Sequence, residues 1–187
     1  ASAQIFTGHG HPLHRQNLPL PDALDPGAVL VAIDLATICG SDLHTLSGLR
    51  QEPTPLILGH EAVGRIVATE RPDLAPGDRI SWSIADSCGS CPACTEHRLP
   101  EKCDHLFKYG HAALADGSGL NGCYATHLLL RPGTHIAKID DQLPDALVAP
   151  ANCALATAVN ACALLPIPCD RVLVQGAGLL GLYTCAL

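Results

Sequence analysis

The chain has 187 residues, 48% of them hydrophobic and 16% charged, a composition that predicts a globular protein with one domain and part of a second. Its net charge of −7, with eleven basic residues scattered among eighteen acidic ones, argues against nucleic acid and an anionic membrane surface as partners. No export signal or apolar run long enough to span a bilayer stands out, so we expect a cytoplasmic protein.

Short strands separated by dense turn residues dominate the first 140 residues. Aromatic residues make up only 3% of the chain, so the core should be built from Ala, Val, Leu and Ile. The stretch 86–121 is long, irregular and rich in Cys, Gly and Pro, and a loop of this length needs a staple or a function. The expected elements are an edge strand at 4–7, a strand at 28–37, a short helix at 38–46 ended by Gly48, and strands at 61–69, 79–84, 122–130 and 134–139.

The pattern changes near residue 145. Residues 145–165 carry apolar side chains at helical spacing, and Pro166 and Pro168 should end that helix. Residues 171–175 read as a short buried strand, and 176–187 as a glycine-rich turn that opens a helix. The predicted fold is therefore a mainly β, barrel-like domain with short helices, followed by the first βα unit of an α/β domain.

Ten cysteines are a high count for a chain without an export signal, and their clustering favours a reducing compartment with metal sites. Cys88, Cys91 and Cys94 form two consecutive C-x2-C spacings, and Cys103 follows. Four thiolates fill the tetrahedral coordination of Zn²⁺, so such a site is structural, and its binding energy offsets the entropy of ordering the loop.

Two other interpretations of these four cysteines are disulfides or unlinked thiols, and a zinc ribbon that binds nucleic acid. Two adjacent C-x2-C spacings favour a metal over disulfides. Cys103 lacks a second C-x2-C partner, and acidic residues surround the lobe, which argues against nucleic acid; they are Asp86, Glu96, Glu101 and Asp104.

Further motifs lie on both sides of the cysteine lobe. They are Cys39-Gly-Ser-Asp-Leu-His44, Gly59-His-Glu-Ala-Val-Gly64, Cys153 on the predicted helix, and Gly176-Ala-Gly-Leu-Leu-Gly181 after a predicted strand. In this order they resemble the zinc-containing medium-chain alcohol dehydrogenases, which join a GroES-like catalytic domain to a Rossmann domain. The resemblance implies a GroES-like domain at 1–150, with the zinc lobe at 86–105. It also implies that 151–187 holds a linking helix and the beginning of an NAD(P)-binding domain.

The resemblance also implies roles for single residues. Cys39, His60 and Cys153 would hold a catalytic zinc with an open fourth position, with Glu61 as a nearby carboxylate. A chain would then carry two zinc ions, the second in the lobe. Ser41 and His44 match the family's proton relay, Asp42 the carboxylate that orients His60, and Thr157 a residue close to the nicotinamide. The lobe departs from the family in one respect, because eight residues separate Cys94 from Cys103 where seven are common.

The implied activity is oxidation of a small-molecule alcohol to an aldehyde or ketone by hydride transfer to NAD or NADP. Gly176, Gly178 and Gly181 would let the cofactor's pyrophosphate approach the helix N-terminus. The acidic residue that distinguishes NAD from NADP is expected about 20 positions after this motif, beyond Leu187. The whole enzyme should be a homo-oligomer, and this chain alone should show no turnover.

Three segments resemble a narrower subgroup, the alcohol dehydrogenases associated with phosphonate catabolism. They are 106–114, 122–127 and 149–158. The substrate implied is a hydroxyalkyl phosphonate or a related compound. Two other functions remain open: a non-catalytic, zinc-stabilised GroES-like binding module, and a zinc-free reductase of the same superfamily, against which the joint presence of Cys39, His60 and Cys153 argues.

Overall fold

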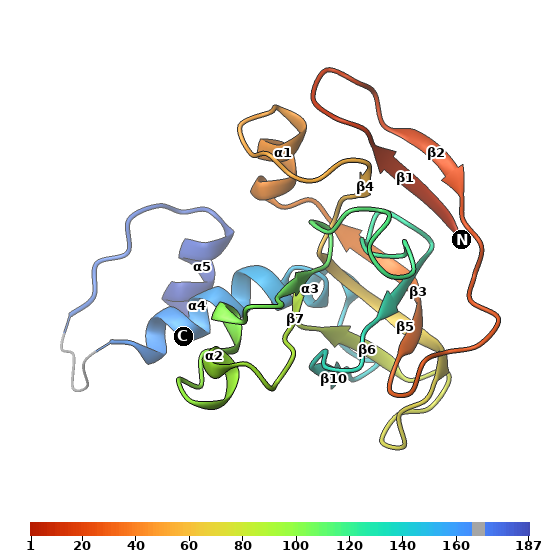
Figure 1. Cartoon of the computed structure of the whole chain (residues 1–187). Coiled ribbons are helices and arrows are strands. Elements are labelled where there is room, and N and C mark those ends of the chain that lie inside the picture. Colours follow the sequence, from red (N-terminus) through yellow and green to blue (C-terminus); the bar gives the residue numbers. More distant parts are fainter. Residues whose placement is uncertain (166–170) are drawn as a thin grey trace.

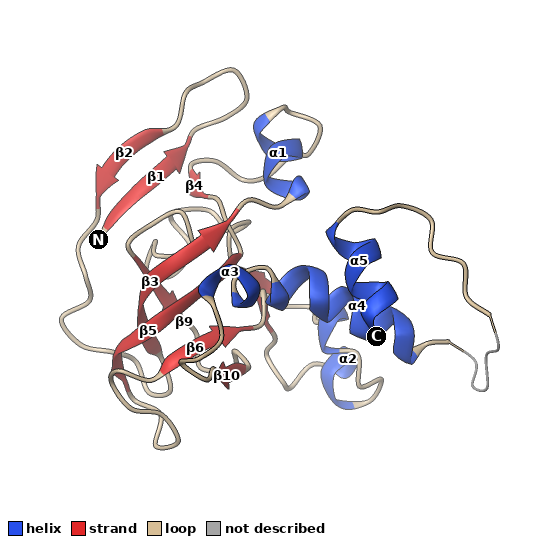
Figure 2. Cartoon of the chain, turned by 180° about the vertical axis from the view of Figure 1, so that it is seen from behind, coloured by secondary structure: helices blue, strands red, loops and turns tan. Residues whose placement is uncertain are grey.

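Antiparallel strands from the first 140 residues form two sheets that wrap into a barrel-like body, and the helices of the last 40 residues project from one side of it (Figures 1 and 2). This computed structural model describes residues 1–165 and 171–187. The larger sheet has the order β10-β6-β5-β3-β9, formed by Ile136–Lys138, Arg79–Trp82, Glu61–Thr69, Val29–Thr37 and His127–Leu130. The smaller sheet has the order β2-β1-β4, formed by His14–Asn17, Ser2–Phe6 and Leu56–Ile57.

The remaining elements are short. A two-stranded ladder, β7 and β8, closes the base of the cysteine lobe with Ala85–Asp86 and Phe107–Lys108. The helices are α1 (Gly40–Leu46), α2 (Pro92–Thr95), a 3₁₀ turn (Pro100–Lys102), α3 (Asp145–Val148), a π-helical turn (Ala151–Leu155), α4 (Ala156–Ala163) and α5 (Leu179–Ala186).

The central strands β3 and β5 are rich in the β-branched residues that favour strands. Their pairing is interrupted by a register shift between Ile33 and Leu35, opposite Gly64. A Cβ at Gly64 would lie 2.3 Å from the carbonyl oxygen of Ala32, so the last glycine of the G-H-E-x-x-G motif is required by this close approach of two backbones.

The barrel core confirms the predicted aliphatic character and adds buried aromatic residues. Val29, Val31 and Ile80 are fully buried, and Trp82 and Tyr109 pack with them. The Tyr109 hydroxyl is 2.7 Å from the Thr134 hydroxyl and accepts a hydrogen bond from the backbone N–H of Arg131 at 2.8 Å. The buried hydroxyl of Tyr109 therefore has hydrogen-bond partners.

Several strand predictions are corrected by the structure. The first strand begins at Ser2 and lies in the middle of its sheet, so it is not an edge strand. The strand predicted at 79–84 ends at Trp82, and the one at 122–130 begins at His127. Residues 123–126 instead exchange hydrogen bonds with β1 and with the segment around Leu58, and so join the two sheets.

The C-terminal third also differs from its prediction. The helix predicted at 145–165 is divided into α3, the π-helical turn and α4, and the proline pair expected to end it lies outside the described residues. The strand predicted at 171–175 does not form. A parallel strand needs a neighbour to hydrogen-bond with, and no described strand lies beside it. The predicted C-terminal helix is confirmed as α5, which packs across α4 (Figure 1).

The helical segment 145–163 is long and apolar enough to cross a membrane by length and composition alone, with a mean hydropathy of 1.5. The sequence-based expectation that no such run exists is therefore wrong by this criterion. Core helices of globular proteins meet the same criterion, so it is weak evidence for a membrane span. In this chain the segment is broken into three helical pieces, and its π-helical turn packs on β5. This packing places Cys153 beside the barrel.

Arg79 fixes the point where this helical segment begins. Its guanidinium is almost fully buried and donates to the carbonyl oxygens of Asp140 at 2.6 Å and Leu143 at 2.8 Å, and to the carboxylate of Asp145. A buried guanidinium needs acceptors around it. These bonds tie the start of α3 to the barrel strand β6.

Candidate metal centres

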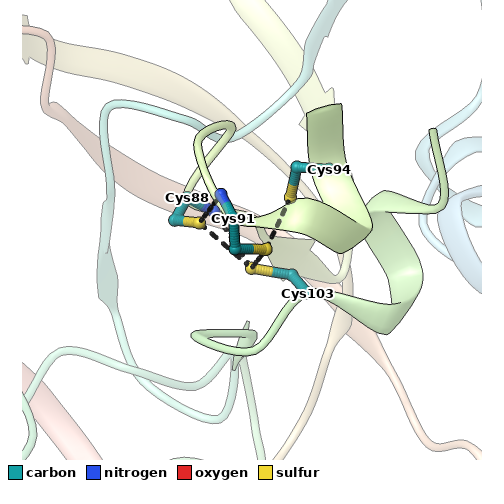
Figure 3. A group of neighbouring side chains, drawn as sticks. All are labelled: Cys88, Cys91, Cys94 and Cys103. Atoms are coloured by element: carbon teal, nitrogen blue, oxygen red, sulfur yellow. Dashed lines mark hydrogen bonds between the residues drawn. The ribbon is translucent and has the colours of Figure 1, made fainter. Parts of the chain in front are cut away.

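The four lobe cysteines converge on one point, although they come from a loop, from the N-cap of α2 and from the end of a 3₁₀ turn (Figure 3). The sulfur atoms are 3.5 Å apart for Cys91 and Cys94, 3.9 Å for Cys91 and Cys103, and 3.5 Å for Cys88 and Cys103. A disulfide requires about 2.05 Å, whereas Zn–S bonds of about 2.3 Å in a tetrahedron place the sulfurs about 3.8 Å apart. The spacing fits a zinc ion.

Backbone N–H groups surround these sulfurs. Cys91 donates to the Cys88 sulfur at 3.4 Å, and Cys88 and His105 each donate to the Cys103 sulfur at 3.3 Å. Hydrogen bonds from Ser90 and Cys91 lower the pKa of Cys88 to about 6, which favours its thiolate. Burial and the neighbouring Cys91 raise the pKa of Cys94 to about 12.

The eight residues between Cys94 and Cys103 include a tight turn. Arg98 has a φ of 55°, the only left-handed φ at a non-glycine residue among those described. It lets the chain reverse between α2 and the 3₁₀ turn, so that Cys103 still reaches the other sulfurs.

A second cluster forms from residues that are far apart in the sequence. Cys39, His60, Glu61 and Cys153 each contribute one potential ligand atom, and these atoms all lie within 4.8 Å of one another. Two sulfurs, an imidazole nitrogen and a carboxylate oxygen are a ligand set that suits Zn²⁺. Glu61 is 4% exposed and accepts a hydrogen bond from the Thr37 hydroxyl at 2.7 Å.

Asp42 contacts the residues that flank this cluster. One of its oxygens accepts from the backbone N–H of Cys39 and from the Tyr124 hydroxyl, both at 2.9 Å, and the other accepts from the N–H of Gly59 at 3.3 Å. Nδ1 of His60 lies 3.5 Å from the same carboxylate, which leaves Nε2 as the nitrogen available to an ion. The carboxylate is fully buried, and the hydrogen bonds to its charged form lower its pKa although burial opposes this.

Glycines are required where the backbones approach this network. Gly59 has a φ of 91°, and a Cβ there would lie 2.6 Å from the ring of Tyr124. The glycine that precedes His60 is therefore needed both for its left-handed backbone and for the room it leaves.

The π-helical turn delivers Cys153 to the cluster. The side-chain NH₂ of Asn152 donates to the carbonyl oxygens of His60 at 2.9 Å and Trp82 at 3.0 Å, which ties the turn to two barrel strands. π-Helical turns are rare and occur often at functional sites. A π-helical turn contains more residues per turn than an α-helix, so it changes the direction in which its side chains point. The π-helical turn therefore helps to position the thiol of Cys153.

The second cluster favours a positive charge at its centre. Burial opposes protonation of His60, but Asp42, Cys153 and Cys39 together raise the pKa of His60 to about 10. The donor chemistry, burial and electrostatics all fit a bound zinc ion.

The structure places the other predicted site residues around this cluster. Ser41 is half-buried in the first turn of α1, and His44 is exposed one turn later. Thr157 is exposed on α4 and donates to the carbonyl oxygen of Cys153 at 2.7 Å. The prediction that Thr157 and Cys153 share a helix face is confirmed, because both line the same cleft.

That cleft has a volume of about 710 Å³ and lies between β6, β10, the cysteine lobe and the helical segment. Its lining is mostly apolar, with Trp82, Ile84 and Ile136 among its residues, and it includes Cys153 as its single residue from the second cluster. Ser41 and His44 do not line it. The predicted proton relay and this cleft are therefore separate features.

The glycine motif adopts the expected turn without its strand. Gly176 has a φ of 107°, Gly178 is the N-cap of α5, and a Cβ at Gly181 would lie 2.0 Å from the carbonyl oxygen of Gly176. Among the described residues, and apart from the adjoining residues of the chain, no atom lies within 4 Å of a Cβ built at Gly176 or Gly178. This leaves the open approach to the helix N-terminus that a pyrophosphate requires.

Several residues at the second cluster were missed by the sequence analysis. Asn152 and Tyr124 belong to segments noted only for a subgroup resemblance, and nothing in their local sequence indicates their partners. Arg50, Glu52 and His111 form a further group next to His60. Of these, only His111 lies in a segment that the sequence analysis singled out.

Comparison with known proteins agrees with this geometry. Residues 25–141 match the model of the alcohol dehydrogenase GroES-like domain. The chain is 32% identical over 179 residues to an L-threonine 3-dehydrogenase from Edwardsiella ictaluri, covering 91% of this chain and 48% of that protein. Among solved structures, it is similar to an alcohol dehydrogenase from Thermotoga maritima, with a TM-score of 0.89, 33% identity and coverage of 98% of this chain and 53% of that one.

An alcohol dehydrogenase from Thermus sp. ATN1 is also similar, with a TM-score of 0.78, 27% identity and coverage of 98% of this chain and 53% of that one. The chain therefore spans about half the length of the relatives it matches. The family match covers more than half of the chain and includes the lobe and most of the second cluster. The predicted fold class is confirmed, except that the strand of the βα unit does not form among the described residues. The chain belongs to the zinc-type medium-chain alcohol dehydrogenases, with their GroES-like domain.

Proposed function

We propose that this chain is the catalytic-domain portion of a zinc-dependent alcohol dehydrogenase that oxidises a small alcohol with NAD or NADP. The observation that carries the proposal is the convergence of Cys39, His60 and Cys153, with Glu61, on one point with the chemistry of a zinc site. Three protein ligands with a further carboxylate nearby are the pattern of a catalytic zinc, whereas the four-thiol lobe is the pattern of a structural one.

The chain's own residues would divide the work as follows. Cys39, His60 and Cys153 hold the ion, which when bound lowers the pKa of an alcohol hydroxyl toward ~7. Asp42 holds the His60 ring in place. Ser41 and His44 lie on α1, directly after the ligand Cys39, and we assign them to proton transfer from the alcohol toward solvent.

We place the catalytic domain at 1–150 and the start of the nucleotide-binding domain at 151–187. Thr157 lies one helical turn from Cys153, which supports a position next to the nicotinamide. The turn at Gly176, Gly178 and Gly181 has the open backbone approach that a pyrophosphate needs. We expect the whole enzyme to contain the rest of the nucleotide-binding domain and to form a homo-oligomer. Its remaining residues would decide between NAD and NADP.

The proposed substrate class is a hydroxyalkyl phosphonate or a related anionic alcohol. It rests on the subgroup resemblance of residues 106–114, 122–127 and 149–158, all of which lie at or beside the second cluster. We assign the protein to a reducing, cytoplasmic compartment because two clusters of free thiols serve as metal ligands in this proposal.

Metal counting tests the proposal directly. The zinc-loaded chain should contain two zinc ions, and Cys153→Ala or His60→Ala should each lower the count to one without unfolding the barrel. Cys185→Ala, an exposed cysteine outside both clusters, is the matched control and should leave two ions in place. A wild-type count of one, confined to the lobe, would instead identify a non-catalytic zinc-stabilised module.

A further inference from the structure

A charged side-chain array lies next to the second cluster and is not used by the proposed chemistry. The rings of His111 and His60 are 5.1 Å apart between centroids. Nδ1 of His111 is 3.0 Å from Oε1 of Glu52, and the same oxygen is 2.5 Å from Nε of Arg50. Three consecutive contacts therefore connect a proposed zinc ligand to a guanidinium group.

The array is built so that only Arg50 reaches solvent. The side chains of His111 and Glu52 are 7% and 10% exposed, whereas that of Arg50 is 39% exposed. The backbone of Arg50 is also fixed, because its N–H donates to the carbonyl oxygen of His44 at 3.1 Å, on α1, whose N-cap is Cys39. Glu52 therefore fixes the guanidinium of Arg50, and the bond to His44 fixes its backbone.

The hydrogen-bonding capacity of Arg50 is only partly used. Glu52 forms an ion pair at Nε, and no described residue accepts a hydrogen bond from the two terminal nitrogens. A guanidinium with its terminal N–H groups free presents a planar fork that matches the oxygens of a phosphonate, phosphate or carboxylate.

We propose that Arg50 is a specificity-determining residue that binds the phosphonate or phosphate group of an alcohol whose hydroxyl is directed to the zinc site, with Glu52 and His111 as positioning residues. This inference rests on the proposed function and adds the residue that recognises the substrate's anionic end. A phosphate group of the cofactor could be bound by the same chemistry, so the experiment compares a substrate phosphonate with a cofactor phosphate as the ligand of Arg50. The contact chain from Arg50 to His60 favours the substrate, which must also reach the metal ligands.

The experiment uses the zinc-loaded 187-residue chain and follows the Nε–Hε NMR signal of Arg50 while ligands are added. The ligands are 2-hydroxyethylphosphonate, ethylphosphonate, 1-propanol and NADP. Both phosphonates should move the Arg50 signal. Arg50→Gln should weaken binding of 2-hydroxyethylphosphonate about 10-fold or more and leave 1-propanol binding unchanged, because a charged hydrogen bond is lost only with the anion. Arg50→Lys should recover part of the loss.

Arg15→Gln removes the same charge from the exposed strand β2 and should bind all ligands as the wild type does. Glu52→Gln should shift the Arg50 Nε–Hε signal even before a ligand is added, because Glu52 contacts Nε directly. A substitution that only perturbs the fold at a distance would not shift this signal. The inference is overturned if Arg50→Gln binds the phosphonate as tightly as the wild type, or if Arg50 responds to NADP alone.

The proposed function is tested separately by the hydroxyl group. 2-Hydroxyethylphosphonate should bind more tightly than ethylphosphonate, and Cys153→Ala should abolish that advantage. Equal affinity of the wild type for the two phosphonates, with weaker binding in Arg50→Gln, would refute the proposed zinc site and still support the anion site. Tighter binding of 2-hydroxyethylphosphonate than of ethylphosphonate, with no effect of Arg50→Gln, would refute only the role of Arg50.

Discussion

Asn152 shows how one side chain decides whether the second cluster can form. It lies 92 residues from His60 in sequence, yet its amide group hydrogen-bonds to the carbonyl oxygens of His60 and Trp82. Those two bonds hold the π-helical turn, and therefore Cys153, against the barrel. Groups that orient metal ligands commonly change metal affinity when they are replaced.

Asn152→Leu keeps the size of the side chain and removes both donors. We expect about 10-fold weaker binding of the second zinc ion, with the lobe ion unchanged. Competition with a chromophoric chelator measures both affinities. Asn160→Leu, the same change at an exposed position of α4, is the control, and equal zinc affinity in the two variants would contradict the role assigned to Asn152.

Tyr109 gives a residue-scale prediction for pH. Burial raises the pKa of Tyr109 to about 12, against the hydrogen bonds from Arg131 and Thr134. The unfolded chain loses this proton near pH 10, before the folded protein does. The free energy of unfolding should therefore fall as pH rises from about 10 to about 12, by roughly 2–3 kcal/mol from this group.

Tyr109→Phe lacks the titrating group and also lacks the two hydrogen bonds. It should be less stable than the wild type at neutral pH, and the difference should shrink between about pH 10 and about pH 12. Urea denaturation of both proteins at several pH values gives the comparison. A constant difference across that range would mean that Tyr109 ionises equally in both states.

At the scale of elements, the lobe shows secondary structure too short to be stable alone. β7, β8, α2 and the 3₁₀ turn contain two to four residues each, and few apolar side chains hold them together. The convergent sulfurs replace a hydrophobic core. At the base of the lobe, Arg131 lies over the ring of Phe107 at 4.5 Å and 3.3 Å from a carboxylate oxygen of Asp86.

Cys103→Ser should therefore remove one zinc ion and unfold the lobe without unfolding the barrel. We expect new protease cleavage within residues 88–103, detected by mass spectrometry, and unchanged binding of the second zinc ion. Cys162→Ser, at a half-buried position outside both clusters, should have neither effect. A lobe that resists proteolysis without its metal would show that packing alone orders it.

At the scale of the whole molecule, the barrel and the π-helical turn together hold both proposed metal sites, whereas the glycine turn and α5 have no sheet beside them among the described residues. The glycine turn and α5 are present, but no strand forms before them among the described residues, and α5 rests on α4. A parallel sheet needs several βα units before it can bind a dinucleotide across its edge.

The zinc-loaded 187-residue chain should consequently bind metal and produce no NADH or NADPH from alcohols. Absorbance of the reduced cofactor during incubation with 2-hydroxyethylphosphonate or 1-propanol checks this. Turnover above that of a Cys39→Ala His60→Ala variant would show that the chain assembles a working cofactor site by itself, contrary to this expectation.

The sequence by itself determined the chemistry of the two clusters. Cys88, Cys91, Cys94 and Cys103 are close in the chain, so their spacing alone restricts them to one lobe, and the structure brings them together. The second ligand set, Cys39, His60, Glu61 and Cys153, came from resemblance to a family, and the structure brings it together as well. Their assignment as zinc ligands remains a prediction.

Only the tertiary structure decided which groups surround those ligands. Asn152, Tyr124 and Arg50 are ordinary polar residues in sequence, and their partners come from other strands and turns. The strand predicted at 171–175 and the unbroken helix at 145–165 failed for the same reason. Local propensity sets what a segment favours, but hydrogen-bond partners supplied by distant segments decide what it forms.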